Sequence, residues 1–290
     1  MRRVLALVLL LAALPACGQE LVDQPFQYTL DPAGGAPAPA SAPAEPAAPA
    51  TADEGPPLER AVEPPSADRL RVLVLSGGGY HDFAGNLKLL LAAVEARRPM
   101  TVTELVLAPA DAAAPTSRRA LEEADLPAEF DAILVYTQGD LSLTPTMQDK
   151  LLAFVRGGGG LVALHCAADS FPGWAGWDDL LRGRFERHPP FTDIVVTVSD
   201  ATHPVLAGLP PEWILRDEFY HLKDCAPDDK HVIMTGISPE GGDVRPVTWV
   251  RDFGSGRVVY TILGHGAETH GDARYQQFVE QALAWAARRS

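Results

Sequence analysis

Short apolar runs alternate with amphipathic stretches over residues 70–165, and this alternation predicts strands that alternate with helices. We expect strands at 71–75, 101–107, 132–136 and 161–164, and helices around 87–94, 117–124 and 145–155. Thr144 and Pro145 match an N-cap followed by proline at the first helical position, and Gly157 is placed to end that helix. The order of elements predicts an open, mostly parallel α/β sheet with helices on both faces and right-handed crossovers.

The pattern is less regular after Asp169, where aromatic and turn-forming residues gather. Further strands are expected at 193–198, 231–235, 246–250 and 257–263. Tyr275, Phe278, Val279, Ala282 and Ala286 lie at helical spacing, so a last amphipathic helix is expected near the end of the chain.

The first 68 residues differ in character from the rest. Arg2 and Arg3 precede an apolar stretch that is too short to span a bilayer, and Leu14 to Cys17 resembles a bacterial lipobox. We therefore predict a signal peptide at 1–16 and a lipidated Cys17, with a plain signal peptide cut nearby as the alternative.

Residues 17–68 are rich in alanine and proline and lack the large apolar side chains that a core needs, which predicts a disordered tether. Residues 69–290 would form the folded domain. The expected location is the bacterial cell envelope, facing the periplasm or the outer membrane, with the lipid anchor as the only membrane contact.

The charge balance narrows the list of partners. The 290 residues carry a formal net charge of -14 at neutral pH, which argues against nucleic acid because phosphate binding needs clustered lysine and arginine.

Three histidines follow predicted strands, and this is the main sign of a functional site. His81, His165 and His265 come after the strands at 71–75, 161–164 and 257–263. Ligands in open α/β sheets bind beyond the carboxyl ends of the strands, so we expect the three histidines to share a pocket. His165 also opens a tight corner of small residues, which resembles a nucleophile elbow. The alternative is an ordinary strand end with a structural histidine.

Other polar candidates lie in the connections. His188 and His203 each precede a proline, and Asp217-Glu218 stands beside Phe219 and Tyr220. A solvated acidic turn is the alternative explanation for the two carboxylates. The sequence contains no G-x-G-x-x-G, G-K-[ST], H-E-x-x-H or C-x-x-C pattern, so we predict no cofactor and assign no metal ligands. A divalent metal assembled from scattered side chains remains an alternative.

Eight short motifs, in the right order from about Leu70 to the C-terminal helix, resemble the ThuA-like (trehalose-utilisation) family. They are Gly79-Tyr80-His81-Asp82, Gly158 to His165, Phe185 to Pro189, His203-Pro204-Val205, Asp217 to Tyr220, Pro246 to Trp249, Gly256-Arg257-Val258 and Leu263-Gly264-His265. The resemblance implies a flavodoxin-like domain of the class I glutamine amidotransferase-like superfamily. It also implies that His165 stands at the elbow position of the catalytic cysteine, with Cys166 one residue later, so glutamine hydrolysis is not expected.

The family is associated with the breakdown of disaccharides and their keto derivatives, alongside sugar oxidoreductases. The resemblance therefore implies a small carbohydrate ligand and a sugar oxidoreductase as partner. Our hypothesis is acid–base chemistry by mostly neutral histidines and a carboxylate; the catalytic candidates are His81, His165, Glu218 and His265. The candidate substrate contacts are Asp82, Asp169, His188, His203, Tyr220 and Trp249, with Trp174 and Trp177 either stacking on sugar or filling the core. A non-catalytic carbohydrate-binding or scaffold domain is the alternative.

Overall fold

The computed structural model describes residues 68–290 except 109–114, 142, 224–228 and 290. These residues belong to one compact unit, Ala67–Ser290. The predicted signal peptide, Cys17 and all of the tether before Asp68 lie outside the described residues. Within the described part, no helix is long and apolar enough to cross a membrane.

The described residues form one large sheet in the strand order β2-β1-β3-β4-β11-β10-β9-β6-β7. Its strands are β1 (Leu70–Gly77), β2 (Met100–Val106), β3 (Ala132–Thr137), β4 (Gly160–Leu164), β6 (Thr192–Val198), β7 (Glu212–Asp217), β9 (His231–Ile237), β10 (Val244–Phe253) and β11 (Gly256–Thr261). A small second sheet pairs β5 (Arg184–Arg187) with β8 (His221–Lys223).

Strand direction determines which loops share an edge. β2, β1, β3, β4 and β11 are paired in parallel, whereas β10 and β6 are antiparallel to both of their neighbours. Two reversals restore the original direction, so β9 and β7 also run the same way as the parallel strands. The predicted mostly parallel α/β sheet is confirmed, and the carboxyl ends of β1, β4, β11 and β7 point in the same direction.

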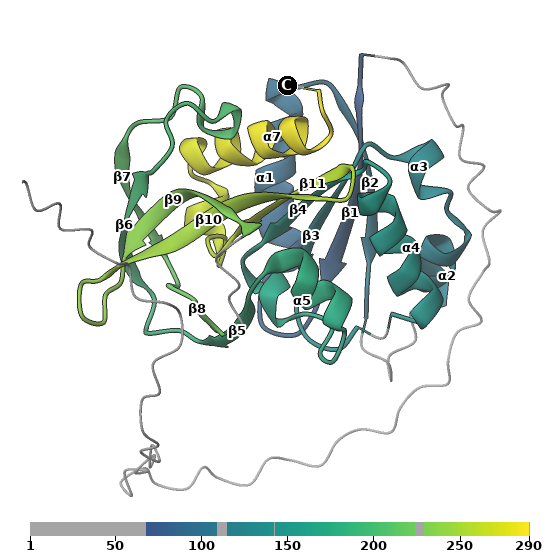
Figure 1. The fold of residues 1–290 in the computed structure, drawn as a ribbon, viewed down its shortest axis with the longest axis horizontal. Helices are drawn as coiled ribbons and strands as arrows, with labels where there is room; N and C mark the ends of the chain where they lie inside the picture. Colours follow the sequence, from purple (N-terminus) through teal and green to yellow (C-terminus); the bar gives the residue numbers. More distant parts are fainter. Residues whose placement is uncertain (1–67, 109–114, 142, 224–228, 290) are drawn as a thin grey trace, which may run out of the picture. The chain divides into compact units, whose positions relative to one another are not determined.

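Helices cover both faces of the sheet (Figure 1). They are α1 (Phe83–Arg97), α2 (Pro115–Glu123), α3 (Leu126–Glu129), α4 (Pro145–Arg156), α5 (Ala175–Leu181), α6 (Ala267–His270) and α7 (Ala273–Ala286), with 3₁₀ turns at His165–Asp169 and Pro204–Leu206. α1 packs against α7 on one face, and α4 and α5 contact the sheet from the other. The predicted N-cap is confirmed, since Thr144 accepts a hydrogen bond from the backbone of Met147.

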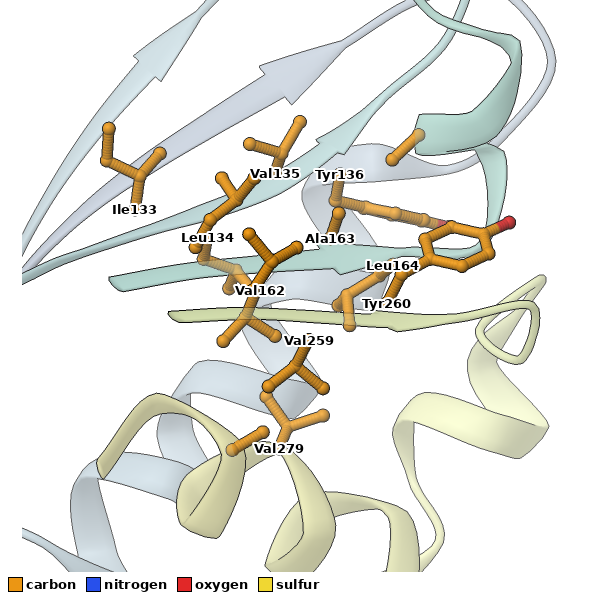
Figure 2. Close-up of a cluster of buried hydrophobic side chains, with 14 of the residues drawn as sticks. Ile133, Leu134, Val135, Tyr136, Val162, Ala163, Leu164, Val259, Tyr260 and Val279 are labelled. Carbon is orange, nitrogen blue, oxygen red and sulfur yellow. The ribbon is translucent and has the colours of Figure 1, made fainter. Parts of the chain in front are cut away.

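The core lies around the central strands. β3 and β4 are buried along their whole length, because helices cover both sides of a parallel sheet and the strands therefore read as continuous apolar runs. Figure 2 shows Val162 and Val259 of neighbouring strands near Val279 of α7. This packing fixes the strand ends from which the site residues project.

β7 is the main element that the sequence pattern missed. Its buried positions alternate with exposed ones, as expected for a half-buried strand. The last buried position is Asp217, and a charged residue there hides the apolar alternation. The short strands β5 and β8 and the helix α3 were not expected either. β11 ends at Thr261, two residues earlier than predicted.

Candidate functional site

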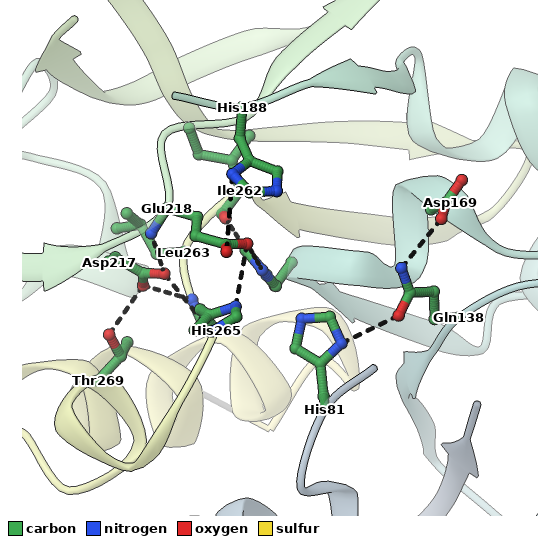
Figure 3. Close-up of polar contacts among 12 residues, drawn as sticks. His81, Gln138, Asp169, His188, Asp217, Glu218, Ile262, Leu263, His265 and Thr269 are labelled. Atoms are coloured by element: carbon green, nitrogen blue, oxygen red, sulfur yellow. Dashed lines mark hydrogen bonds and ion pairs between the residues drawn. The ribbon is translucent and has the colours of Figure 1, made fainter. Parts of the chain in front are cut away.

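Four of the predicted site residues meet at the carboxyl edge of the sheet, and Figure 3 shows three of them, His81, Glu218 and His265. His81 follows β1, His165 follows β4, His265 follows β11 and Glu218 follows β7. One ligand atom from each of these side chains lies within 4.8 Å of the others. The predicted grouping is therefore observed, and we call these four residues the His/Glu cluster.

His165 occupies the corner that was expected to resemble an elbow. Its φ of 45° is left-handed, which is uncommon for a residue with a side chain and requires support from its surroundings. The ring is fully buried, and its Nδ1 lies 2.5 Å from the carbonyl oxygen of Ile262. A carbonyl only accepts hydrogen bonds, so Nδ1 carries the proton and Nε2 presents a lone pair. That Nε2 faces Glu218 Oε2 at 3.4 Å.

His81 is oriented by a relay of two polar side chains. Gln138 Nε2 donates to Asp169 at 3.0 Å, which fixes the amide so that its Oε1 lies 3.0 Å from His81 Nδ1. His81 Nδ1 is therefore the donor, and Nε2 is a buried lone pair without a hydrogen-bond partner. Burial, together with the nearby His165 and His265, lowers the pKa of His81 to about 3, so this ring is neutral at pH 7.

The loop that carries His265 is held by side chains from several elements. The carbonyl groups of residues 263, 264 and 265 accept hydrogen bonds from Tyr275, His270 and Tyr136 at 3.0, 2.9 and 3.2 Å. Two backbone N–H groups of the same loop donate to Asp217. Because nearly every backbone group here has a partner, the position of His265 is set by the surrounding fold.

Glu218 brings negative charge to the cluster. Its Oε2 lies 3.0 Å from His265 Nδ1, and its Oε1 lies 3.6 Å from His188 Nδ1. Burial alone would raise the pKa of Glu218, but the nearby His165 and His265 outweigh it and lower the pKa far below its ordinary value. In return Glu218 raises the pKa of His265, against our expectation of an ordinary value. Among the described residues, Glu218 has no lysine or arginine in ion-pair contact.

The cluster has the composition of a metal centre. Imidazole suits divalent transition metals, and the ring N–H that a ligand histidine does not use is normally donated to a carbonyl or carboxylate. His165 follows this rule through Ile262, and His81 follows it through Gln138 and Asp169. Tetrahedral zinc bonds of ~2.1 Å would place ligand atoms ~3.4 Å apart, and the four candidate atoms lie within 4.8 Å of one another, so some of them would have to move closer to hold an ion. We assigned no metal ligands from the sequence, and these four residues form a group that could hold a metal ion.

Three further candidates lie next to the cluster. The ring of Tyr220 lies 4.0 Å from that of His165, and His188 stacks on Tyr220 at 5.7 Å. Among the described residues, hydrogen bonds link Asp169 to the cluster through Gln138. Gln138 was not predicted, although it follows β3 at the same edge, so the strand-end argument could have found it.

The remaining candidates have other surroundings. Asp82 caps α1, accepting from the backbone of Gly85 at 2.9 Å. The ring of His203 packs against Trp285 and His231. Within the described part of the chain, His203 makes no ring contact with the cluster. The indole of Trp249 is buried and donates to the carbonyl of Leu181. The structure does not bring His203 or Trp249 to the site.

The two tryptophans that could have contacted sugar belong to the core. Trp174 and Trp177 stack on each other at 5.7 Å, and the indole of Trp177 donates to the carbonyl of Ala167. Both are almost fully buried. Bulky apolar side chains are used first for packing, and this is their role here.

The open, mostly parallel sheet with helices on both faces and polar side chains at its carboxyl edge defines an α/β protein. A sequence model of the ThuA family, described as trehalose utilisation, matches residues 71–286, and the chain belongs to this family. The family resemblance and the α/β fold class expected from the sequence are thus confirmed.

Solved structures agree on the fold. A ThuA-like protein from Parabacteroides merdae is 19% identical with a TM-score of 0.63, covering 76% of this chain and 90% of its own. A ThuA-like protein from Bacteroides uniformis is 18% identical with a TM-score of 0.59, covering 78% and 94%. A cytoplasmic protein from Salmonella typhimurium is 12% identical with a TM-score of 0.51, covering 75% and 99%. No curated protein matched in sequence.

Proposed function

We propose that this domain is an enzyme that acts on a small carbohydrate, such as a disaccharide or its keto derivative, with a divalent transition metal bound by the His/Glu cluster. The observation that carries the proposal is the facing pair of lone pairs on His165 Nε2 and Glu218 Oε2, 3.4 Å apart. Two acceptors at this distance repel each other unless a proton or a metal ion lies between them, and we propose that a metal ion does. The buried lone pair of His81 Nε2 supports the same conclusion.

A bound metal would supply Lewis acidity, which polarises a carbonyl group or lowers the pKa of a water molecule. The chain itself provides the proton acceptor. His188 Nδ1 donates to the carbonyl of Pro189 at 2.9 Å, so the neutral ring has its lone pair on Nε2. Its side chain is 36% exposed, so solvent can reach the ring. His188 can thus accept a proton from a sugar hydroxyl or from the carbon beside a ketone.

Support for a carbohydrate comes from the family description, trehalose utilisation, and from aromatic rings near the cluster. Phe191 lies 5.3 Å from His265, and Tyr80, next to His81, is 85% exposed. Flat apolar ring faces next to polar groups suit a sugar, which has both kinds of surface. A keto derivative would be supplied by a sugar oxidoreductase, which we propose as the functional partner.

Cys166 does not support an amidotransferase reaction. The thiol is fully buried, and burial raises its pKa well above the ordinary value. A nucleophilic cysteine needs an accessible thiolate, so glutamine hydrolysis is not part of the proposal.

Metal content and turnover test the proposed function together. The purified domain should bind about one zinc ion per chain, and chelator treatment should abolish turnover of disaccharides or keto-glycosides. Restoring a divalent ion should restore turnover. Metal and sugar binding without turnover would favour the non-catalytic carbohydrate-binding alternative. A protein that binds no divalent metal would overturn the proposal.

We also propose that Cys17 is lipidated and anchors the domain to the cell envelope, supported by the lipobox-like Leu14 to Cys17 segment. Changing Cys17 to Ser should remove lipid labelling and move the protein from the membrane fraction to the soluble fraction. Equal membrane fractionation of the parent and the Cys17→Ser variant would show that this anchor is wrong.

A further inference from the structure

We propose that Asp217 is the positioning residue of the site, which fixes Glu218 and His265 at the separation a shared cation requires. This inference rests on the proposed metal function and adds a role for Asp217 to it. Asp217 lies outside the His/Glu cluster and has no contact with the proposed metal, so its action would pass through the two ligands that it orients.

All acceptor positions of the Asp217 carboxylate are used by donors from two ligand-bearing segments. One oxygen accepts from the backbone N–H groups of Glu218 at 2.8 Å and His265 at 3.0 Å. The other accepts from the N–H of Gly264 at 2.7 Å and, at 2.8 Å, from the hydroxyl of Thr269, which lies farther, 3.1 Å, from the carbonyl of Arg216. Four donors match the roughly four lone-pair directions of a carboxylate.

The sheet alone does not connect these segments. β7, which carries Asp217 and leads to Glu218, is an edge strand and is separated from β11 by β10, β9 and β6. No ladder hydrogen bond therefore joins the end of β7 to the loop that carries His265. Asp217 makes that connection directly, which brings an edge strand to the same site as a central strand.

The charge of Asp217 also needs an explanation. The side chain is fully buried and, among the described residues, has no ion pair with lysine or arginine, while Glu218 next to it is a second carboxylate. A buried charge is costly unless it is hydrogen-bonded or paired. Four donors offset part of this cost, and a cation between Glu218 and the histidines would offset more. Asparagine is not equivalent, because its NH₂ group would face N–H donors.

An isosteric substitution with a matched control tests the inference. Asp131 is a suitable control because it also bonds a backbone N–H, that of Arg71 at 2.9 Å, and its side chain is 11% exposed at the start of β3. Both Asp217→Asn and Asp131→Asn should lower the Tm of the metal-free protein. Only Asp217→Asn should weaken zinc binding, by ~10–100-fold, the usual effect of losing a group that orients metal ligands. Affinity is measured by competition with a chromophoric chelator.

The outcomes separate this inference from the proposed function. If the parent protein binds no zinc, both fail. If the parent binds zinc and Asp217→Asn keeps its affinity within about twofold, or Asp131→Asn loses as much, the positioning role is wrong. If Asp217→Asn does not fold, Thr269→Val removes one of the four donors. It should weaken zinc binding in the same direction to a smaller extent, and unchanged affinity in that variant would also overturn the inference.

Discussion

Replacing Glu218 with Gln should lower turnover by ~10²-fold or more and weaken zinc binding in parallel, while leaving the fold intact. Glu218 is the one carboxylate of the His/Glu cluster, and glutamine has the same shape without the charge. The Tm of the metal-free variant should change by no more than a few degrees. Zinc titration, steady-state kinetics on a keto-glycoside and circular dichroism measure the three effects.

Glu280 provides the matched control for this substitution. Its side chain is 11% exposed, as is that of Glu218, but it pairs with Arg98 on the α7 side of the domain. Glu280→Gln should keep zinc affinity and turnover. If Glu218→Gln lost turnover with zinc affinity unchanged, Glu218 would act as an acid or base and not as a ligand. If it retained both, the site assignment would be wrong.

Much of the site could be predicted from one rule about parallel sheets. His81, His165 and His265 each follow an apolar run, and the carboxyl ends of parallel strands meet at one edge. The strands are easy to recognise because burial on both faces makes them continuously apolar. The rule depends on local sequence and strand direction alone, so no long-range information was needed.

Glu218 shows where that reasoning stops. Its strand, β7, ends in the buried Asp217. Asp217 in turn accepts hydrogen bonds from the loop after β11, and this long-range contact places the end of β7 at the site. Nothing in the local pattern specifies this contact. The family resemblance, and not the strand pattern, led to Glu218.

The tautomers of the histidines also depend on contacts between distant segments. Ile262 accepts from His165 across 97 residues, and Gln138 bonds His81 across 57. These two contacts fix the tautomers of His165 and His81, so that Nε2 of each ring carries the lone pair. Without them the sequence supports acid–base chemistry as well as metal binding, and no local metal-binding motif marks these residues in the sequence.

Changing Gly264 to Ala should produce the second large effect, a loss of both stability and the site. Gly264 has a φ of 128°, which a residue with a side chain rarely adopts. An added Cβ would also lie 2.6 Å from the hydroxyl of Tyr275 and 3.3 Å from Cβ of His165. Strained backbone alone costs ~1–3 kcal/mol, and each kcal/mol lowers Tm by ~2–4 °C in a domain of this size. The displaced loop should also misplace His265, so zinc affinity should fall.

Gly266, two residues later, is the matched control. Its φ of -145° is ordinary extended backbone, and an added Cβ would meet only the flexible end of Glu268, at 3.3 Å. Gly266→Ala should therefore keep Tm within a few degrees and leave zinc affinity unchanged. The contrast is measured by thermal unfolding of the metal-free proteins and by zinc titration below the Tm of the weaker variant. Equal behaviour of the two alanine variants would mean that the Gly264 backbone does not position His265.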